Sequence, residues 1–253
     1  MKTLIVGNGG RESALAEKMS ESSKVSAVMG HMNPSIADVV NKTGGAIRIG
    51  KITDPNLVAD FAGKNGIDLA MVSADSPLES GVVDALLERG IPTVGPDREG
   101  ARIEWDKAFS RKLIQEVAPE ANPLHRIARS RKEVLEVFKE FGDEPVAVKP
   151  KGLTGGKGVK VVGPHLRDND EARDFALSLI DEGGFDPAVI IEEKIEGVEF
   201  TLQAITDGRT VVFPPASYDY PYRFEGDSGP GTGGMGAYTM RERPLPFMTQ
   251  GEY

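Results

Sequence analysis

The 253-residue sequence contains no cysteine. This absence excludes disulfides, thiolate metal sites and cysteine nucleophiles, and it fits a reducing compartment. No apolar run approaches the roughly 20 residues that a membrane-spanning helix needs, and the run after Met1 is too short for a signal peptide. We therefore expect a cytoplasmic protein without a membrane partner.

Aromatic residues and positive charge are also scarce. Aromatics make up 6% of the chain, and 39 acidic residues against 30 basic ones give a formal net charge of −9. Because nucleic-acid binding needs a basic face, we expect no nucleic-acid partner. His31, His125 and His165 have neither metal-ligand nor triad spacing, so the sequence predicts no metal site among the histidines.

The first hundred residues alternate apolar runs with amphipathic stretches. The runs predict strands and the stretches predict helices, with strands at 3–6, 26–29, 68–72 and 91–94 and helices at 11–22, 54–65 and 78–89. The third helix is expected to begin with Ser76 as N-cap, Pro77 at the first helical position and Glu79 closing a capping box. This alternation predicts an α/β fold with a doubly wound parallel sheet, whose ligands bind at the carboxyl edge.

The rhythm changes after about residue 100. Helices are predicted at 106–117, at 131–141 with Ser130 as N-cap, and at 169–182, and strands at 145–149, 159–162, 188–193 and 198–205. Asp207-Gly208 predicts a hairpin with a tight primed turn. The stretch 214–236, rich in proline, glycine and tyrosine, is expected to form an ordered loop.

Residues 149–162, KPKGLTGGKGVKVV, concentrate lysine and glycine in this acidic chain. A Walker-type phosphate loop is excluded because Gly158, not Ser or Thr, follows Lys157 and a strand is predicted next. The pattern instead favours a flexible strand–loop–strand hairpin, in which backbone N–H groups and lysines can bind phosphate. A mobile surface turn would have the same composition.

Two other stretches are compatible with nucleotide or phosphate binding. In IIEEKIEGVEF (190–200), backbone groups beside Glu192 and Glu193 could bind an adenine edge and Glu199 could bind ribose, although the stretch taken alone favours a solvated acidic turn. In GNGGRE (7–12), Glu12 stands where a dinucleotide-binding loop has its third glycine. This loop favours a single phosphate at a helix N-terminus over a nicotinamide dinucleotide, and a simple strand-to-helix turn is the alternative.

Three runs together carry a resemblance to a known family: VAVKPKGLTGGKGVKVV, VIIEEKIEGVEF and GDSGPGTGGMGAY. They resemble the ATP-grasp ligases and, more narrowly, the phosphoribosylamine–glycine ligase (glycinamide ribonucleotide synthetase) family of purine biosynthesis. The resemblance covers the whole chain. It implies a Rossmann-like domain at 1–100 and an incomplete ATP-grasp α+β domain at 101–253, with a small lid at about 120–192.

The resemblance implies an ATP site in the second domain. The phosphates are expected at Lys107, at Lys149 and under a covering loop formed by Gly155, Gly156, Lys157 and Gly158. Among these residues, Lys157 is expected to act catalytically. Adenine is expected at Glu192, Glu193, Lys194 and Ile195, and ribose at Glu199.

The implied reaction joins glycine to phosphoribosylamine through glycyl phosphate, so small molecules are the expected partners. Phosphoribosylamine is expected at the first loop, Asn8, Gly9, Gly10, Arg11 and Glu12, with Asp75 across the sheet edge. Glycine or the acyl phosphate is expected near Asp219, Thr232, Gly233 and Gly234.

The sequence departs from the family pattern at several positions. Ser13 stands in place of a histidine, Asp75 in place of a glutamate, and 220–222 in place of His-Lys-Arg, with Arg223 as a candidate substitute for the lost cations. The family's Mg²⁺ (or Mn²⁺) ligands are expected beyond Tyr253, so we interpret the chain as a fragment with weak or absent ligase activity, with a short natural variant as the alternative. A non-catalytic nucleotide-binding fragment and another ATP-grasp ligase remain alternatives, and the sequence does not indicate an oligomeric state.

Overall fold

The computed structural model describes residues 1–152, 158–182, 187–241, 244–249 and 251. The chain divides into two compact units, Met1–Ser110 and Arg111–Tyr253. Within the described part of the chain, no helix is both long and apolar enough to cross a bilayer.

The first unit is built on a five-stranded sheet in which every paired neighbour is parallel. Its spatial order is β3-β2-β1-β4-β5. The strands are β1 (Lys2–Val6), β2 (Lys24–Met29), β3 (Ile47–Ile49), β4 (Leu69–Val72) and β5 (Thr93–Val94). The order reverses between β1 and β4, so the loops after these strands flank the switch point at which such sheets bind ligands.

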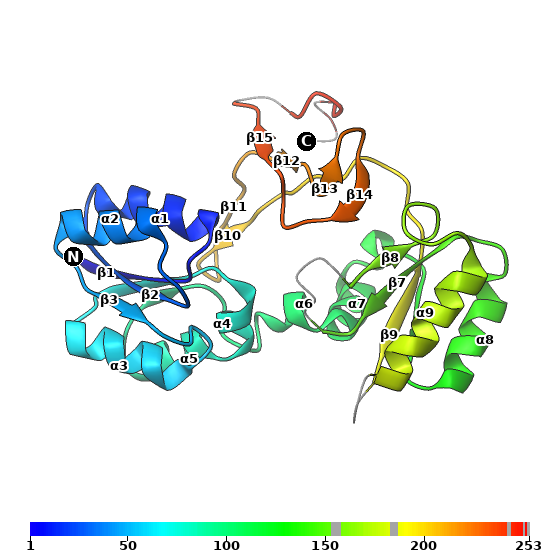
Figure 1. The fold of residues 1–253 in the computed structure, drawn as a ribbon, viewed down its shortest axis with the longest axis horizontal. Helices are drawn as coiled ribbons and strands as arrows, with labels where there is room; N and C mark the ends of the chain where they lie inside the picture. Colours follow the sequence, from blue (N-terminus) through cyan, green and yellow to red (C-terminus); the bar gives the residue numbers. More distant parts are fainter. Residues whose placement is uncertain (153–157, 183–186, 242–243, 250, 252–253) are drawn as a thin grey trace. The chain divides into compact units, whose positions relative to one another are not determined.

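Helices cover both faces of this sheet (Figure 1). The helices of the unit are α1 (Gly10–Ser20), α2 (Pro34–Thr43), α3 (Pro55–Asn65), α4 (Asp75–Glu79), α5 (Val82–Glu88) and α6 (Arg102–Trp105), of which α1, α2, α3 and α5 cover the sheet. Alternate residues of β1 enter different cores: Leu4 and Val6 pack with α3 and α5, whereas Ile5 packs with α1 and α2. The doubly wound parallel sheet predicted from the sequence is therefore confirmed.

The prediction of one continuous helix at 78–89 is wrong in detail, because the structure has two helices there, α4 and α5. Gly81 has φ +78°, a left-handed conformation that interrupts a right-handed helix, and it serves as the N-cap of α5. The predicted capping box is also wrong, since α4 begins at Asp75 after Ala74 and no side chain caps it. The short strand β3 and the helix α2 were not predicted from the sequence.

The second unit contains a four-stranded antiparallel sheet in the order β6-β9-β7-β8. Its elements are α7 (Lys107–Val117, which begins in the first unit), the 3₁₀ turn Pro119–Ala121, β6 (His125–Ala128), α8 (Arg131–Phe141), β7 (Val146–Pro150), β8 (Lys160–Val161), α9 (Asn169–Glu182) and β9 (Val189–Glu193). The Ser130 hydroxyl accepts the Glu133 N–H at 3.2 Å, which confirms the predicted cap.

The two faces of this sheet differ. Val146 and Val148 of β7 and Ile191 of β9 pack into one core with α8 and α9, which lie together on one side of the sheet (Figure 1). Because side chains alternate along a strand, Lys149 and Glu192 project from the opposite face.

The segment from about 194 to 241 differs from its sequence prediction. Of the strand expected at 198–205, the structure forms only β10 (Ile205–Thr206), which pairs with β11 (Val211–Val212) in the predicted hairpin, and one bridge from Thr201 to Ser217. The expected loop 214–236 instead contains short antiparallel strands: β12 (Ser217–Asp219), β13 (Tyr222–Phe224), β14 (Ser228–Gly231) and, just beyond, β15 (Ala237–Thr239). Apolar side chains in this segment remain exposed, including Phe200 and Phe213.

Candidate functional site

The loop after β1 is organised around a buried carboxylate. Glu12 lies in the first turn of α1 and is only 4% exposed. Its carboxylate accepts the Gly9 N–H at 2.8 Å and the Ser73 hydroxyl at 2.6 Å, and Arg11 Nε lies 3.4 Å from it. Ser73 follows β4, so Glu12 ties together the two loops at the switch point of the sheet.

Gly7 allows the Glu12 side chain to lie across this turn. The φ of Gly7 is +130°, and a Cβ there would lie 2.7 Å from Glu12 Cγ. The sequence analysis noted that Glu12 replaces the third glycine of a dinucleotide loop, and in the structure its carboxylate fills the turn. A second anion can bind here only at the helix N–H groups that Glu12 leaves available.

The pKa of Glu12 lies below its ordinary value. Burial alone would raise this pKa, but the hydrogen bonds from Ser73 and Gly9, together with nearby Arg11, outweigh the effect of burial. The carboxylate is therefore ionised at neutral pH. It can act as a fixed negative group beside whatever binds at the loop.

Asn8 links the same loop to the end of β2. Its side-chain oxygen accepts the Gly30 N–H at 2.9 Å, its amide nitrogen lies 3.1 Å from His31 Nε2, and its carbonyl accepts Asn33 Nδ2 at 3.0 Å. The residues expected to bind phosphoribosylamine thus take part in two sets of contacts, one from Asn8 to the end of β2 and one that joins Gly9, Arg11 and Glu12 to Ser73. Asp75 begins α4 and lines a separate small cavity of about 80 Å³ with Leu78 and Trp105.

A second buried carboxylate lies in the second unit. Glu192 of β9 is 3% exposed, and its carboxylate contacts two cations. Arg111 of α7 approaches both carboxylate oxygens, with Nε–Oε1 at 2.5 Å and Nη2–Oε2 at 2.9 Å. Lys149 Nζ of β7 lies 2.5 Å from Oε2. The structure therefore joins Lys149 and Glu192, which the sequence analysis assigned separately to the phosphates and to the adenine segment.

The two cations keep Glu192 ionised. Burial would raise the pKa of Glu192, but the Arg111 hydrogen bond and the Lys149 charge more than offset it, and the pKa falls below its ordinary value. Arg111 was not predicted from the sequence. A signal was present, because Arg111 follows the proposed site residue Lys107 by four positions in the same helix and so shares its face.

The expected adenine segment continues from Glu192 past the end of β9, between the residues that precede β6 and β7. The Glu193 N–H donates to the Leu124 carbonyl, and the Glu193 carboxylate accepts the Leu124 N–H at 2.7 Å. The Lys194 N–H donates to Pro145, while the Ile195 side chain is 70% exposed. The N–H groups of Glu193 and Lys194 are thus already engaged, which leaves Ile195 and carbonyl oxygens as candidate ligand contacts.

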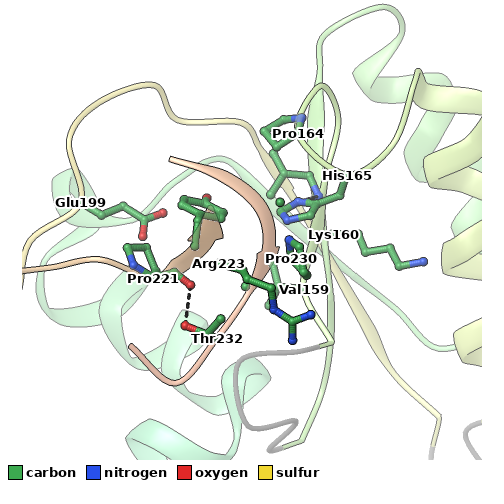
Figure 2. Close-up of a pocket in the computed structure, with 13 residues that line it drawn as sticks. Val159, Lys160, Pro164, His165, Glu199, Pro221, Arg223, Pro230 and Thr232 are labelled. Carbon is green, nitrogen blue, oxygen red and sulfur yellow. Dashed lines mark hydrogen bonds between the residues drawn. The ribbon is translucent and has the colours of Figure 1, made fainter. Parts of the chain in front are cut away.

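A large pocket of about 880 Å³ lies between β8, its following turn and the β13–β14 hairpin (Figure 2). Two sequence-predicted residues line it, Glu199 and Thr232, together with three that were not assigned to the nucleotide: His165, Tyr222 and Arg223. Lys160 points away from the pocket in Figure 2, and its Nζ lies 4.2 Å from the centre of the Phe175 ring. The usable positive charge at the pocket therefore comes from Arg223 rather than Lys160.

The region expected to bind glycine adjoins this pocket. Thr232 donates its hydroxyl to the Pro221 carbonyl at 2.9 Å and accepts the Gly234 N–H at 3.1 Å, while Gly234 has φ +106°. Asp219 lines a neighbouring cavity of about 250 Å³ that also includes Glu199. Burial and the nearby charge of Glu199 raise the pKa of Tyr222, so its phenol is a neutral donor there.

Part of the expected phosphate site lies outside the described residues: Gly155, Gly156 and Lys157. Gly158 resumes the described chain just before β8. No group of three or more Asp, Glu or His side chains in the described ranges is arranged to hold a metal ion.

Two family models match the chain along its whole length. Residues 1–104 match the N domain of phosphoribosylglycinamide synthetase, and residues 105–253 match its ATP-grasp (A) domain. The chain belongs to the phosphoribosylglycinamide synthetase family. The family that the sequence motifs resemble is thereby confirmed.

Curated proteins and solved structures agree with this family. The phosphoribosylamine–glycine ligases of Thermococcus kodakarensis and Methanothermobacter thermautotrophicus are 46% and 45% identical to it over the whole chain, and the chain spans 57% of each. The crystal structure of the phosphoribosylamine–glycine ligase of Thermotoga maritima has a TM-score of 0.75 at 24% identity, covering 96% of this chain and 56% of that one. A biotin carboxylase–β,γ-ATP complex from Campylobacter jejuni has a TM-score of 0.67 at 19% identity, covering 88% and 52%. The two structural likenesses describe the ATP-grasp fold.

Proposed function

We propose that this member of the phosphoribosylglycinamide synthetase family binds ATP and phosphoribosylamine for the formation of glycinamide ribonucleotide. The curated relatives that share 43–46% identity with the chain are named for this ligase. Lys149 carries the proposal within the structure: it is a partly exposed cation at the end of β7, on the sheet face opposite α8 and α9.

The proposed reaction proceeds in two steps. A carboxylate oxygen of glycine attacks the γ-phosphorus of ATP, the bond to the β–γ bridging oxygen breaks, and ADP leaves with the electron pair. The amine of phosphoribosylamine then attacks the carbonyl carbon of glycyl phosphate, and inorganic phosphate leaves as the nitrogen loses a proton. The first nucleophile is already ionised at neutral pH, so that step needs no protein base.

The protein's task in such a reaction is to position the groups and to stabilise negative charge. In the part of the chain that matches the ATP-grasp (A) domain, we assign the phosphates to Lys149, Lys107 and the loop with Lys157, adenine to the segment 192–195 and ribose to Glu199. Asp219 and the turn 232–234 are assigned to glycine or the acyl phosphate. Arg223, which lines the 880 Å³ pocket, supplies a positive charge where this chain lacks two cations of the family pattern. When bound, Mg²⁺ would neutralise charge on the ATP phosphates.

In the first unit we assign phosphoribosylamine to the loop Asn8–Glu12. The side chain of Arg11 is 56% exposed and lies at the N-terminal turn of α1, where a phosphate is favoured. The ionised Glu12 occupies the interior of the loop and faces the same ligand with negative charge. This combination fits a molecule that carries a phosphate and, elsewhere, hydroxyl and amine donors.

Calorimetric titration of the chain with ATP tests this proposal first, followed by an assay of ADP release with glycine and phosphoribosylamine. The proposal predicts saturable ATP binding, and in a ligase of the relatives' length it predicts ADP release that requires both other substrates. ATP binding without substrate-dependent ADP release in the longer protein would favour a nucleotide-binding role instead. Absence of ATP binding by the chain would overturn the proposal.

A further inference from the structure

The Arg111–Glu192–Lys149 cluster contains one more cation than its single carboxylate needs. Arg111 approaches both oxygens of Glu192, at 2.5 and 2.9 Å, which is the bidentate geometry that satisfies a carboxylate most completely. Lys149 is a second partner on an oxygen that Arg111 already contacts. The cluster therefore has a net charge of +1 and can accept a further anion.

The two cations differ in the freedom of their side chains. Arg111 has a planar guanidinium fixed by two contacts, whereas Lys149 has a single ammonium on a flexible stem with three donors. The Lys149 side chain is 24% exposed, and that of Glu192 is 4% exposed. Of the two partners, Lys149 can turn toward a ligand while Arg111 stays on the carboxylate.

Burial makes the identity of the remaining partner important. A buried carboxylate without a cation is strongly destabilising, so Lys149 alone would be held firmly on Glu192. With Arg111 present, the carboxylate keeps its charge-assisted hydrogen bonds when Lys149 departs. Arg111 thus lowers the free-energy cost of moving Lys149 from the protein to a phosphate.

We propose that Arg111 is a positioning residue for ATP binding: it holds Glu192 so that Lys149 can exchange this carboxylate for a phosphate oxygen of the nucleotide. This inference rests on the proposed function, because it takes the ligand of Lys149 to be ATP. It adds a residue that acts through Glu192 and Lys149, without contacting the nucleotide.

The test compares the ATP dissociation constants of the 253-residue chain and its variants by calorimetry. Arg111→Met should raise the constant about tenfold, because Lys149 is then needed by Glu192, and Arg111→Lys should raise it less. Arg111→Met combined with Glu192→Gln should return it to within about threefold of the parent, because the unpaired carboxylate is removed with its partner. Adenosine affinity, which does not involve a phosphate, should stay unchanged in the two Arg111 single variants.

Arg126→Met is the matched control. Arg126 lies on β6 of the same sheet and is also paired with a glutamate, Glu140, but both side chains are largely exposed. Its loss should leave the ATP dissociation constant within about twofold of the parent, as expected for an exposed ion pair.

A second readout works without nucleotide. The rate at which acetic anhydride labels Lys149, followed by mass spectrometry, should fall in Arg111→Met and rise when Glu192→Gln is added, because the carboxylate then no longer holds the ammonium.

If the parent fails to bind ATP while the labelling responds in this way, the proposed function fails but the coupling of Arg111 to Lys149 stands. Unchanged labelling in Arg111→Met and Arg111→Lys would overturn the inference. A double variant that binds ATP as weakly as Arg111→Met would also overturn it, since Arg111 would then contact the nucleotide directly.

Discussion

Glu12 and Glu192 are the buried carboxylates of the two candidate sites, and their surroundings differ in kind. Glu12 is held by neutral donors, the Ser73 hydroxyl and the Gly9 N–H, with one exposed arginine beside it. Glu192 is held by two cations, Arg111 and Lys149. Both pKa values lie below the ordinary value, so both groups are charged at neutral pH.

This difference separates a carboxylate that builds a loop from one that can exchange a partner. The donors to Glu12 belong to the backbone and to a short side chain, so they cannot leave without disturbing the turn. One donor to Glu192 is Lys149, whose long side chain has several rotatable bonds and is 24% exposed. Burial and a lowered pKa are common to both sites, and only the chemistry of the partners distinguishes a structural role from a binding role.

The largest expected effect is on the stability of the first unit. Glu12→Leu should lower the free energy of unfolding by about 3 kcal/mol, because the Gly9 N–H and the Ser73 hydroxyl lose their acceptor in a buried place. Urea denaturation measures the change, with Glu17→Leu on the exposed face of α1 as control. A loss no greater than that of the control would mean that the carboxylate does not organise the loop.

Removal of this lysine should affect binding more than folding. Lys149→Met is expected to weaken ATP binding about 30-fold, the scale of losing one charge-assisted hydrogen bond to phosphate, with little change in adenosine binding. Calorimetry measures both affinities, and Lys132→Met, on an exposed face of α8, is the matched control. Equal losses for ATP and adenosine would show that Lys149 supports the site without contacting phosphate.

Gly7→Ala tests whether the first loop has space to adapt. The φ of +130° and the 2.7 Å approach to Glu12 Cγ predict a loss of about 2 kcal/mol in unfolding free energy. Gly10→Ala should instead be neutral or stabilising, since a Cβ there meets nothing within 4 Å. Thermal unfolding distinguishes the two, and similar midpoints for both variants would refute the tight packing around Glu12.

The smallest expected effect is the pH dependence of Ser73→Ala. The folded state holds the pKa of Glu12 below its ordinary value of 4.5, so this carboxylate stabilises the fold above pH 4.5 and ceases to do so as the pH falls through the folded pKa. Loss of the Ser73 hydrogen bond raises the folded pKa and removes about 1 kcal/mol at neutral pH. The difference in stability from the parent should therefore shrink between pH 5 and pH 3. A difference that is constant over this range would exclude Glu12 as its source.

The fold was predictable where local pattern and burial agree. In the first unit, β1, β2 and β4 appear where continuous apolar runs predicted them. In the second unit, α9 at 169–182 matches its predicted bounds. The break at Gly81 was not predicted, because the apolar spacing continues through 78–89 and hides a glycine whose conformation ends one helix and begins another.

The segment 194–241 was predicted poorly for a different reason. The strand expected at 198–205 has the right alternation, yet Phe200 and Leu202 remain about half exposed. An alternating sequence forms a strand only when a neighbouring strand pairs with it and an apolar face covers it. That information depends on tertiary neighbours and is absent from the local pattern.

The candidate sites were predictable as residue types and not as arrangements. Motifs pointed to Lys149, Glu192 and Glu12, but nothing in the motifs indicates that Lys149 and Glu192 share an ion pair or that Ser73 contacts Glu12. These contacts join residues 43 and 61 positions apart in sequence, from Lys149 to Glu192 and from Glu12 to Ser73. Strand order and register decide them, and a single sequence does not encode those in any local signal.

A structure of the chain with a non-hydrolysable ATP analogue tests the central claim most directly. The account predicts that a phosphate oxygen lies within hydrogen-bond distance of Lys149 Nζ, that this ammonium has left Glu192, and that Arg111 still contacts both oxygens of Glu192. A nucleotide bound at Gly7–Glu12, or a Lys149 still paired with Glu192 beside a bound triphosphate, would contradict it.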